Sequence, residues 1–360
     1  MSAVPADTSR GKEPFMTQAA GVQHSSAGSL FAVTQSAADS IAIVDLSTRS
    51  TGSIVRATIP VGTAPWGIAV DGPARRAYVA TAPGVAIVDL LERRTVALVP
   101  YRDAPASHGF GEYRPGGTGI VVSDDGERVF VAVHRDGRFS TVEVLDTSTQ
   151  SMIASVDVGE RPFDVKLSAD GSEVYTIDHD SFTMHAVSVD GFAVRSYEIA
   201  PFGTAGGHMS HFKPHYAAVA ADGVVYLPYQ GRAVVVLDPA TGAYETRPLT
   251  GDTHQHGTDL SDDGRLLVVG VGEVGGATRG PSLTVYDVET GGEQLIELDR
   301  GHENVLFWRE PGSSRPLAIL TGGSTSRGPW DGLTLVDLDT HEITHLPVPE
   351  KPQAIVRIAD

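Results

Sequence analysis

The 360-residue sequence predicts an all-β fold, a seven-bladed β-propeller of four-stranded antiparallel blades. Three observations predict this fold. A short β-patterned run that ends in aspartate occurs seven times, and most copies follow two apolar runs joined by a tight turn. In addition, the last residues provide a strand that the first repeat lacks.

The aspartate that ends the third strand of each unit sets the period of the repeat. Successive aspartates are 44 to 57 residues apart, which is typical of one propeller blade. Val, Ile, Thr and Tyr dominate the runs, as they do in strands, and no helical period is found. The seven markers are Asp45, Asp89, Asp146, Asp190, Asp238, Asp287 and Asp337.

Glycines mark the tight turn between the first two strands of a unit. Gly126, Gly171, Gly223 and Gly264 lie where a hairpin turn needs a positive φ. Each unit is therefore predicted as strand a, a tight turn, strand b, a variable loop, strand c ending in the aspartate, a turn and strand d.

The two ends of the chain indicate how the ring closes. Residues 29–61 supply strands b, c and d of a first blade, whereas PQAIVRIAD at 352–360 is predicted as a lone strand a. Pairing the two removes an open sheet edge. We expect a single propeller domain over residues 29–360 and a flexible N-terminal arm over residues 1–28, which are rich in Ser, Ala, Gly and Gln.

Composition excludes several classes of partner and site. The formal net charge of -18 argues against nucleic acid and against an anionic membrane surface as partners. The absence of cysteine excludes disulfides and thiolate metal sites. Because neither a membrane-length apolar run nor an apolar signal segment is found, we expect a cytoplasmic protein, or a periplasmic or secreted one if a leader has been removed.

The histidines are concentrated in the loops expected on one face. Nine of the 13 histidines lie in the d–a connections between blades or in the b–c loops within them, which surround the mouth of the central channel. One equivalent position in each blade is found by counting the same number of residues back from the last apolar residue of strand a. The aligned residues are Trp66, Thr118, Phe163, His215, His256 and, in blade 7, Glu303 or Asn304.

This alignment predicts a divalent metal site with a small-molecule ligand. Imidazole and carboxylate groups suit Zn²⁺, Fe²⁺, Cu²⁺, Ni²⁺ or Mn²⁺. The T/S-R-G-P elements in the b–c loops of blades 6 and 7 each carry an arginine that suits an anionic group. The candidates are His215, His256, His211, His302 and His108 as metal ligands; Glu303, His302 and His254 as catalytic groups; and Arg279, Arg327, Trp66 and Tyr229 as substrate-binding residues. The ordinary alternative is that loop histidines are solvated and that each RGP element is a turn whose arginine faces water.

Two segments resemble a known family. PWGIAVDGPARRAYVATAPGVAIVDL at 65–90 and RPFDVKLSADGSEVYTID at 161–178 resemble the YVTN family of seven-bladed propellers. The resemblance covers residues 29 to 360 and implies the fold. Relatives in that superfamily include lactonases, lyases, metal-binding proteins and interaction scaffolds, so the resemblance does not select one activity.

The sequence thus favours a metal-dependent propeller with a histidine-rich site at the channel mouth. The foremost expectation is a metalloenzyme that acts on a small, anionic molecule by lyase, hydrolase or oxidase chemistry. Two alternatives remain open: a zinc-binding, chaperone-like propeller without catalysis, and a non-catalytic interaction scaffold.

Overall fold

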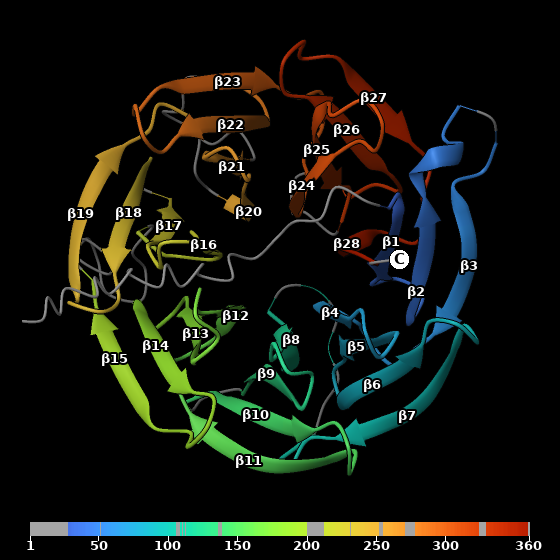
Figure 1. Ribbon diagram of the computed structural model, residues 1–360, viewed down its shortest axis with the longest axis vertical. Coiled ribbons are helices and arrows are strands. Elements are labelled where there is room, and N and C mark those ends of the chain that lie inside the picture. Colours follow the sequence, from blue (N-terminus) through green and yellow to red (C-terminus); the bar gives the residue numbers. More distant parts are fainter. Residues whose placement is uncertain are drawn as a thin grey trace, which may run out of the picture.

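The computed structural model places 28 strands in seven four-stranded antiparallel sheets arranged as a ring (Figure 1). The predicted fold class is confirmed. The residues that the structure describes are 28–50, 52–105, 109, 111, 113–135, 139–199, 212–230, 232–251, 255–270, 278–323 and 329–358. For residues 255 and 256 only the backbone is described.

Each blade runs from an inner strand a beside the propeller axis to an outer strand d (Figure 1). The strands of blades 1 to 4, from the inside outwards, are β28 (Pro352–Arg357), β1 (Leu30–Gln35), β2 (Ser40–Asp45) and β3 (Val55–Pro60); β4 (Ile68–Asp71), β5 (Arg76–Ala80), β6 (Gly84–Asp89) and β7 (Arg94–Pro100); β8 (Gly116–Val122), β9 (Arg128–His134), β10 (Thr141–Asp146) and β11 (Ser151–Asp157); and β12 (Pro162–Leu167), β13 (Glu173–Asp178), β14 (Thr183–Ser188) and β15 (Val194–Glu198).

The remaining blades follow the same order. Their strands are β16 (Ala218–Val219), β17 (Val225–Tyr229), β18 (Ala233–Asp238) and β19 (Ala243–Pro248) in blade 5; β20 (Gln255–Leu260), β21 (Arg265–Gly270), β22 (Ser282–Asp287) and β23 (Glu293–Glu297) in blade 6; and β24 (Val305–Arg309), β25 (Pro316–Thr321), β26 (Leu333–Asp337) and β27 (Ile343–Leu346) in blade 7. A 3₁₀ helix, η1 (Leu46–Thr48), follows β2.

The ring closes as the sequence predicts. Strand β28 pairs antiparallel with β1, and Phe31 lies opposite Arg357. The C-terminal strand therefore completes the first blade, and the edge of β1 that faces the axis is paired. Of the predicted N-terminal arm, residues 1–28, only Gly28 lies within the described residues.

The aspartate markers have a structural cause. Six of the seven end their strand c, and Asp190 lies two residues beyond the end of β14. The carboxylate then accepts backbone N–H groups from the following turn: Asp146 accepts from Thr149 at 2.7 Å, and Asp287 accepts from Thr290 at 2.7 Å. Such Asx turns reverse the chain between strands c and d, which explains the repeat of this residue type.

The hydrophobic core lies in the wedges between adjacent blades. One cluster, for example, joins Tyr78 and Ile87 of blade 2 to Val129 and Val131 of blade 3. Near the axis the inner strands approach so closely that a Cβ added to Gly119 would lie 2.5 Å from the backbone nitrogen of Val165. Close approach of the inner strands therefore requires glycine there.

Hydrogen bonds join neighbouring inner blade edges around the ring. The Thr34 hydroxyl donates to the Trp66 carbonyl at 2.8 Å, and the Thr118 hydroxyl donates to the Pro162 carbonyl at 2.6 Å. The Thr321 hydroxyl donates to the Gln353 carbonyl at 2.8 Å. These contacts fix the rotation of one blade against the next and thus the relative positions of the loops that precede the inner strands.

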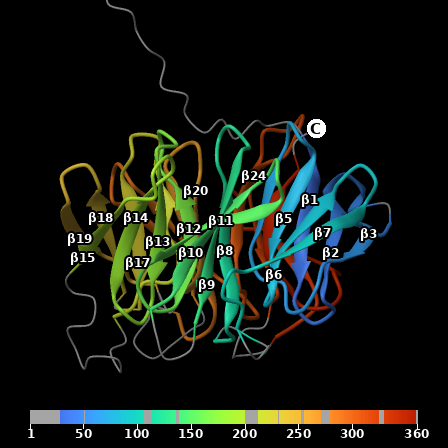
Figure 2. The same cartoon turned by 90° about the horizontal axis from the view of Figure 1, so that it is seen from below.

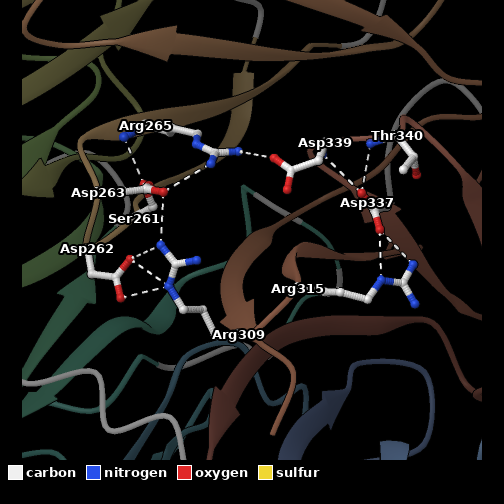
Figure 3. A network of polar contacts seen from close by, with 9 residues as sticks. All are labelled: Ser261, Asp262, Asp263, Arg265, Arg309, Arg315, Asp337, Asp339 and Thr340. Atoms are coloured by element: carbon white, nitrogen blue, oxygen red, sulfur yellow. Dashed lines mark hydrogen bonds and ion pairs between the residues drawn. The ribbon is translucent and has the colours of Figure 1, made fainter. Parts of the chain in front are cut away.

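An ion-pair network ties blades 6 and 7 together at the face where strands a and b are joined (Figure 3). Arg309 contacts Asp262 at 2.6 Å and Asp263 at 2.9 Å, and Arg265 bridges Asp263 to Asp339. Nearby, Arg315 pairs with Asp337 at 2.6 Å.

No helix within the described ranges is long and apolar enough to cross a membrane.

Candidate functional site at the channel mouth

Antiparallel order places the loops on two opposite faces of the ring, as the side view in Figure 2 shows. The a–b and c–d turns lie on one face. The b–c loops and the d–a connections lie on the other face, and we call that face, around the propeller axis, the channel mouth.

The structure fixes the register of the inner strands. The backbone N–H groups of Ser168, Ala220 and Ser261 close the a–b hairpins of blades 4, 5 and 6. Five residues before them stand Phe163, His215 and His256, as the sequence alignment predicts.

Blade 7 departs from that alignment. Its hairpin is closed by Glu310 N–H donating to the Arg315 carbonyl at 3.1 Å, and the fifth residue before Glu310 is Val305. Glu303 and Asn304 precede the aligned position, so the predicted register of blade 7 is wrong by one to two residues. The sequence of β24, VLFWR, does not alternate between apolar and polar residues, so it does not show at which residue the strand begins.

His215 lies against a second buried histidine at the channel mouth. The ring centroids of His215 and His179 are 4.3 Å apart, and both side chains are almost fully buried. Phe163 packs 5.0 Å from each ring. His179 directly follows β13 in the b–c loop of blade 4, so the pair joins blades 4 and 5.

Asp180 orients the His179 ring. His179 Nδ1 lies 2.6 Å from Asp180 Oδ1 and must donate to this carboxylate, which leaves the lone pair on Nε2. Lys213 and Arg161 also contact Asp180, at 3.0 Å and 2.8 Å. The His179 side chain is therefore held in one tautomer, with its lone pair on Nε2.

Burial, followed by the nearby His215, lowers the pKa of His179 to about 3, so this ring is neutral at pH 7. For Asp180, burial alone would raise the pKa. The hydrogen bonds from His179 and Lys213 and the charge of Arg161 outweigh that effect, and the pKa lies below its usual range. At neutral pH the site therefore holds a neutral imidazole against a charged carboxylate.

Tyr113 covers the outer side of this pair. Its ring lies 6.1 Å from Phe163 and 6.3 Å from His179, in edge-to-face geometry. The Arg161 guanidinium stacks over the Tyr113 ring at 4.6 Å. The two histidines are thus enclosed by aromatic walls and by cations that are themselves paired with Asp180.

His302 is turned into blade 7. Its ring is fully buried, and Nε2 lies 2.7 Å from the Thr334 hydroxyl on β26. That hydroxyl lies 2.9 Å from His345 Nδ1 on β27, and His345 Nε2 lies 3.2 Å from Asp299. This chain of polar groups runs towards the outer strands, so the structure does not bring His302 together with His215.

Burial, followed by the charge of His345, lowers the pKa of His302 to about 3. The neighbouring Glu303 is also buried, and its backbone N–H donates to the Thr321 carbonyl. The Glu303 side chain packs closely against Gly323, since a Cβ added to Gly323 would lie 2.2 Å from the Glu303 Cβ.

The predicted substrate-binding residues have separate environments. Trp66 is buried at the start of the blade 2 inner strand, with the Arg114 guanidinium 5.8 Å over its ring. Tyr229 ends β17, is buried in the apolar cluster between blades 4 and 5 and packs edge to face with Phe212. Arg279 is exposed in the b–c loop of blade 6.

Several predicted site residues are not described by the structure. His108, His211, His254 and Arg327 lie outside the described residues, as does the side chain of His256. Within the described part of the chain, no group of three or more His, Asp or Glu side chains is arranged to hold a metal ion.

Sequence reasoning did not pair His215 with His179. The sequence signal that could have paired them is the DHD triplet at 178–180. It lies at a b–c loop, on the same face as the d–a connection that carries His215. It also did not single out Arg114, which precedes the inner strand of blade 3.

No protein-family model and no curated protein matches the chain. Among solved structures, a hydrazine synthase from Kuenenia stuttgartiensis is 14% identical, with a TM-score of 0.62 over 90% of this chain and 93% of that one. A functionally unknown protein from Desulfotomaculum acetoxidans is 7% identical, with a TM-score of 0.66 over 92% and 99%. The dihydro-heme d1 dehydrogenase NirN, in complex with DHE, is 17% identical, with a TM-score of 0.56 over 92% and 75%. At these identities the similarity shows a shared β-propeller fold and nothing finer.

Proposed function

We propose that this propeller binds a divalent transition metal ion at the channel mouth, with His215 and His179 as ligands, and acts there on a small molecule. The observation that supports this proposal is the buried pair of imidazole rings, 4.3 Å apart, one of which is oriented by Asp180. Metal-bound histidines commonly donate their second ring nitrogen to a carboxylate in this way.

The donor set fits a metal of the zinc, iron, copper, nickel or manganese group. The neutral form of an imidazole is the form that binds such an ion, and the pKa of His179 is far below 7. Two imidazoles do not complete a coordination sphere, because a structural zinc site takes four ligands and a catalytic one takes three. His211, His256 and His108 remain the candidates for the others on sequence grounds. We omit His302, because its Nε2 is engaged by Thr334.

A site with an open coordination position would serve a metalloenzyme. A bound ion of this kind supplies Lewis acidity or an activated water. Glu303 and His254 stay candidates for moving the proton, and the resemblance to YVTN propellers allows lyase or hydrolase chemistry, with oxidase chemistry also possible. The similar structures include a synthase and a dehydrogenase, which agrees with a catalytic role but does not define one.

The second candidate is a zinc-binding protein without catalysis. The near-complete burial of both imidazole rings favours it, because a carrier or structural site closes its coordination sphere with protein groups. Turnover of a substrate at the metal-loaded site would distinguish an enzyme from a carrier.

The test is metal binding by the untagged full chain. Metal-stripped protein is titrated with Zn²⁺, Ni²⁺ and Mn²⁺ in a calorimeter, alongside the variants His215→Ala and His179→Ala. The exposed His341 provides the control variant, His341→Ala. We expect uptake by wild type and by the control, with loss in both site variants. Uptake that survives in both site variants would refute this site.

A further inference from the structure

Arg114 is a buried cation for which the described residues provide no acidic partner. It lies directly before the inner strand of blade 3, on the channel-mouth side, and is 3% exposed. Among the contacts of the described residues, Arg114 makes no ion pair with any Asp or Glu side chain. Burying a charge in this way is costly unless another group compensates it.

Hydrogen bonds engage only some of the N–H donors of the Arg114 guanidinium. Nη1 donates to the Pro115 carbonyl at 3.1 Å, and Nη2 donates to the Gly117 carbonyl at 2.7 Å. The buried Nε has no hydrogen-bond partner. A guanidinium carries five N–H donors in a planar fork, so these two bonds satisfy fewer than half of them.

Arg135 in the same blade differs from Arg114 in having a carboxylate partner, although its buried Nε also has no hydrogen-bond partner. This arginine is 6% exposed, and its Nη2 pairs with the fully buried Glu143 at 2.7 Å. Both arginines are buried, and among the described side chains a carboxylate pairs with Arg135 but not with Arg114. Burial lowers the pKa of Arg114 to about 10, which still leaves the group charged at pH 7.

The surroundings of Arg114 hold it in place, and the residue next to it contacts the histidine pair. His134 Nδ1 donates to the Arg114 carbonyl at 2.9 Å and fixes its backbone. The Trp66 ring from blade 2 lies under the guanidinium, 5.8 Å away. The preceding residue, Tyr113, reaches His179 and Phe163. Arg114 thus lies between blade 2 and the proposed metal site.

We propose that Arg114 binds the carboxylate of a small-molecule ligand seated at the channel mouth. The planar fork matches a carboxylate in a bidentate contact, and the Trp66 ring beneath the guanidinium holds the fork in place. A single cation in a chain with a net charge of -18 suits a monoanionic group better than a doubly charged phosphate. The inference deepens the proposed function and rests on it for the position of the ligand. Arg114 thereby replaces the exposed Arg279 as the residue proposed to bind the anionic group.

The experiment measures ligand-induced stabilisation of the metal-stripped full chain. Sodium benzoate, sodium butyrate and phosphate are added at constant ionic strength, and thermal unfolding is followed. We expect a saturable rise in the unfolding temperature with the carboxylates and a smaller rise with phosphate. Arg114→Met should weaken carboxylate binding by about tenfold or more, and Arg114→Lys should weaken it less. Arg279→Ala is the control and should bind as wild type does.

A second readout separates ligand binding from a purely structural role. Without ligand, Arg114→Met should unfold at the same temperature as wild type or a higher one, because it removes an uncompensated charge. Arg135→Met should unfold at a lower temperature, because Glu143 is left buried and unpaired. A carboxylate response that persists in Arg114→Met, the absence of any response in wild type, or a loss of stability equal to that of Arg135→Met would overturn the inference.

The metal titration distinguishes this inference from the proposed function. If wild type binds carboxylates through Arg114 but takes up no metal, the proposed metal site fails and the anion site stands. If Arg114→Met and wild type take up metal equally and neither responds to carboxylates, the anion site fails and the metal site stands.

Discussion

Asp164 is expected to hold His215 in position from the neighbouring blade. Its carboxylate accepts two buried backbone N–H groups, from Val165 and from Ala217, each at 3.0 Å. Ala217 is two residues after His215, and Phe163, which packs on the His215 ring, precedes Asp164. The variant Asp164→Asn keeps the shape of the side chain but replaces one acceptor oxygen with an NH₂ donor.

One of the two buried N–H groups then loses its acceptor. Leaving a buried donor unsatisfied costs about 1–3 kcal/mol. For a chain of this length, with an unfolding entropy of about 2.1 cal/mol/K per residue, that cost lowers the unfolding temperature by about 1–4 °C. Equilibrium denaturation should show a lower midpoint with an unchanged slope. Zinc titration of the same variant should show weaker binding, because the segment ahead of β16 that carries His215 is released.

Thr321→Val is the matched control. The fully buried Thr321 hydroxyl joins blade 7 to blade 1 through the Gln353 carbonyl, far along the ring from blades 4 and 5. We expect a similar loss of stability and unchanged zinc affinity. If Asp164→Asn unfolds like wild type, or if both variants lose zinc affinity equally, the proposed coupling between Asp164 and His215 is incorrect.

Three further predictions concern single carboxylates and one arginine. Asp180→Asn should weaken metal binding by about 10- to 100-fold, measured by calorimetry, because His179 loses its orienting group. Arg309→Met should lower the free energy of unfolding by about 1–2 kcal/mol at low salt and less in 1 M NaCl, since it breaks the network in Figure 3; an equal loss at both salt concentrations would argue against an electrostatic origin. For Asp337, burial alone would raise the pKa, but hydrogen bonds from Thr340 and from Arg315 lower it to about 2. Its stabilisation is therefore complete above about pH 4 and lost as the pH falls towards 2, and Asp337→Asn should lack this part of the acid dependence, measured as midpoint against pH.

The fold could be predicted because its physical causes repeat. In most blades a carboxylate caps the turn after strand c and a positive-φ residue lies between strands a and b, so both recur at blade spacing. Asp146 and Gly126, with φ of 72°, are one such pair. Ring closure by β28 followed from counting the strands of the first unit.

The site could be predicted only in part, because residue contacts at the channel mouth depend on loop geometry. The alignment of inner strands placed His215 correctly, but its closest described partner, His179, comes from a b–c loop whose path no periodicity encodes. His302 was expected near the axis, and its ring instead bonds Thr334 on strand c. Tyr229 ends strand b of blade 5, and the sequence did not show that its ring is buried in the apolar cluster between blades 4 and 5.

Arg114 shows a further limit of sequence reasoning. Its sequence context, a loop arginine before Pro115, is that of an ordinary solvated side chain. The structure shows that it is buried and that no carboxylate in the described part of the chain pairs with it, whereas Glu143 pairs with Arg135.

The most direct test is the metal content and metal affinity of the untagged full chain, compared with the double variant His179→Ala, His215→Ala. We predict one divalent transition metal ion per wild-type chain, tight binding after stripping and reloading, and loss of this site in a double variant that still shows the circular dichroism of a β-propeller. Wild-type protein that binds none of Zn²⁺, Fe²⁺, Cu²⁺, Ni²⁺ or Mn²⁺, or a folded double variant that binds them as wild type does, would contradict it.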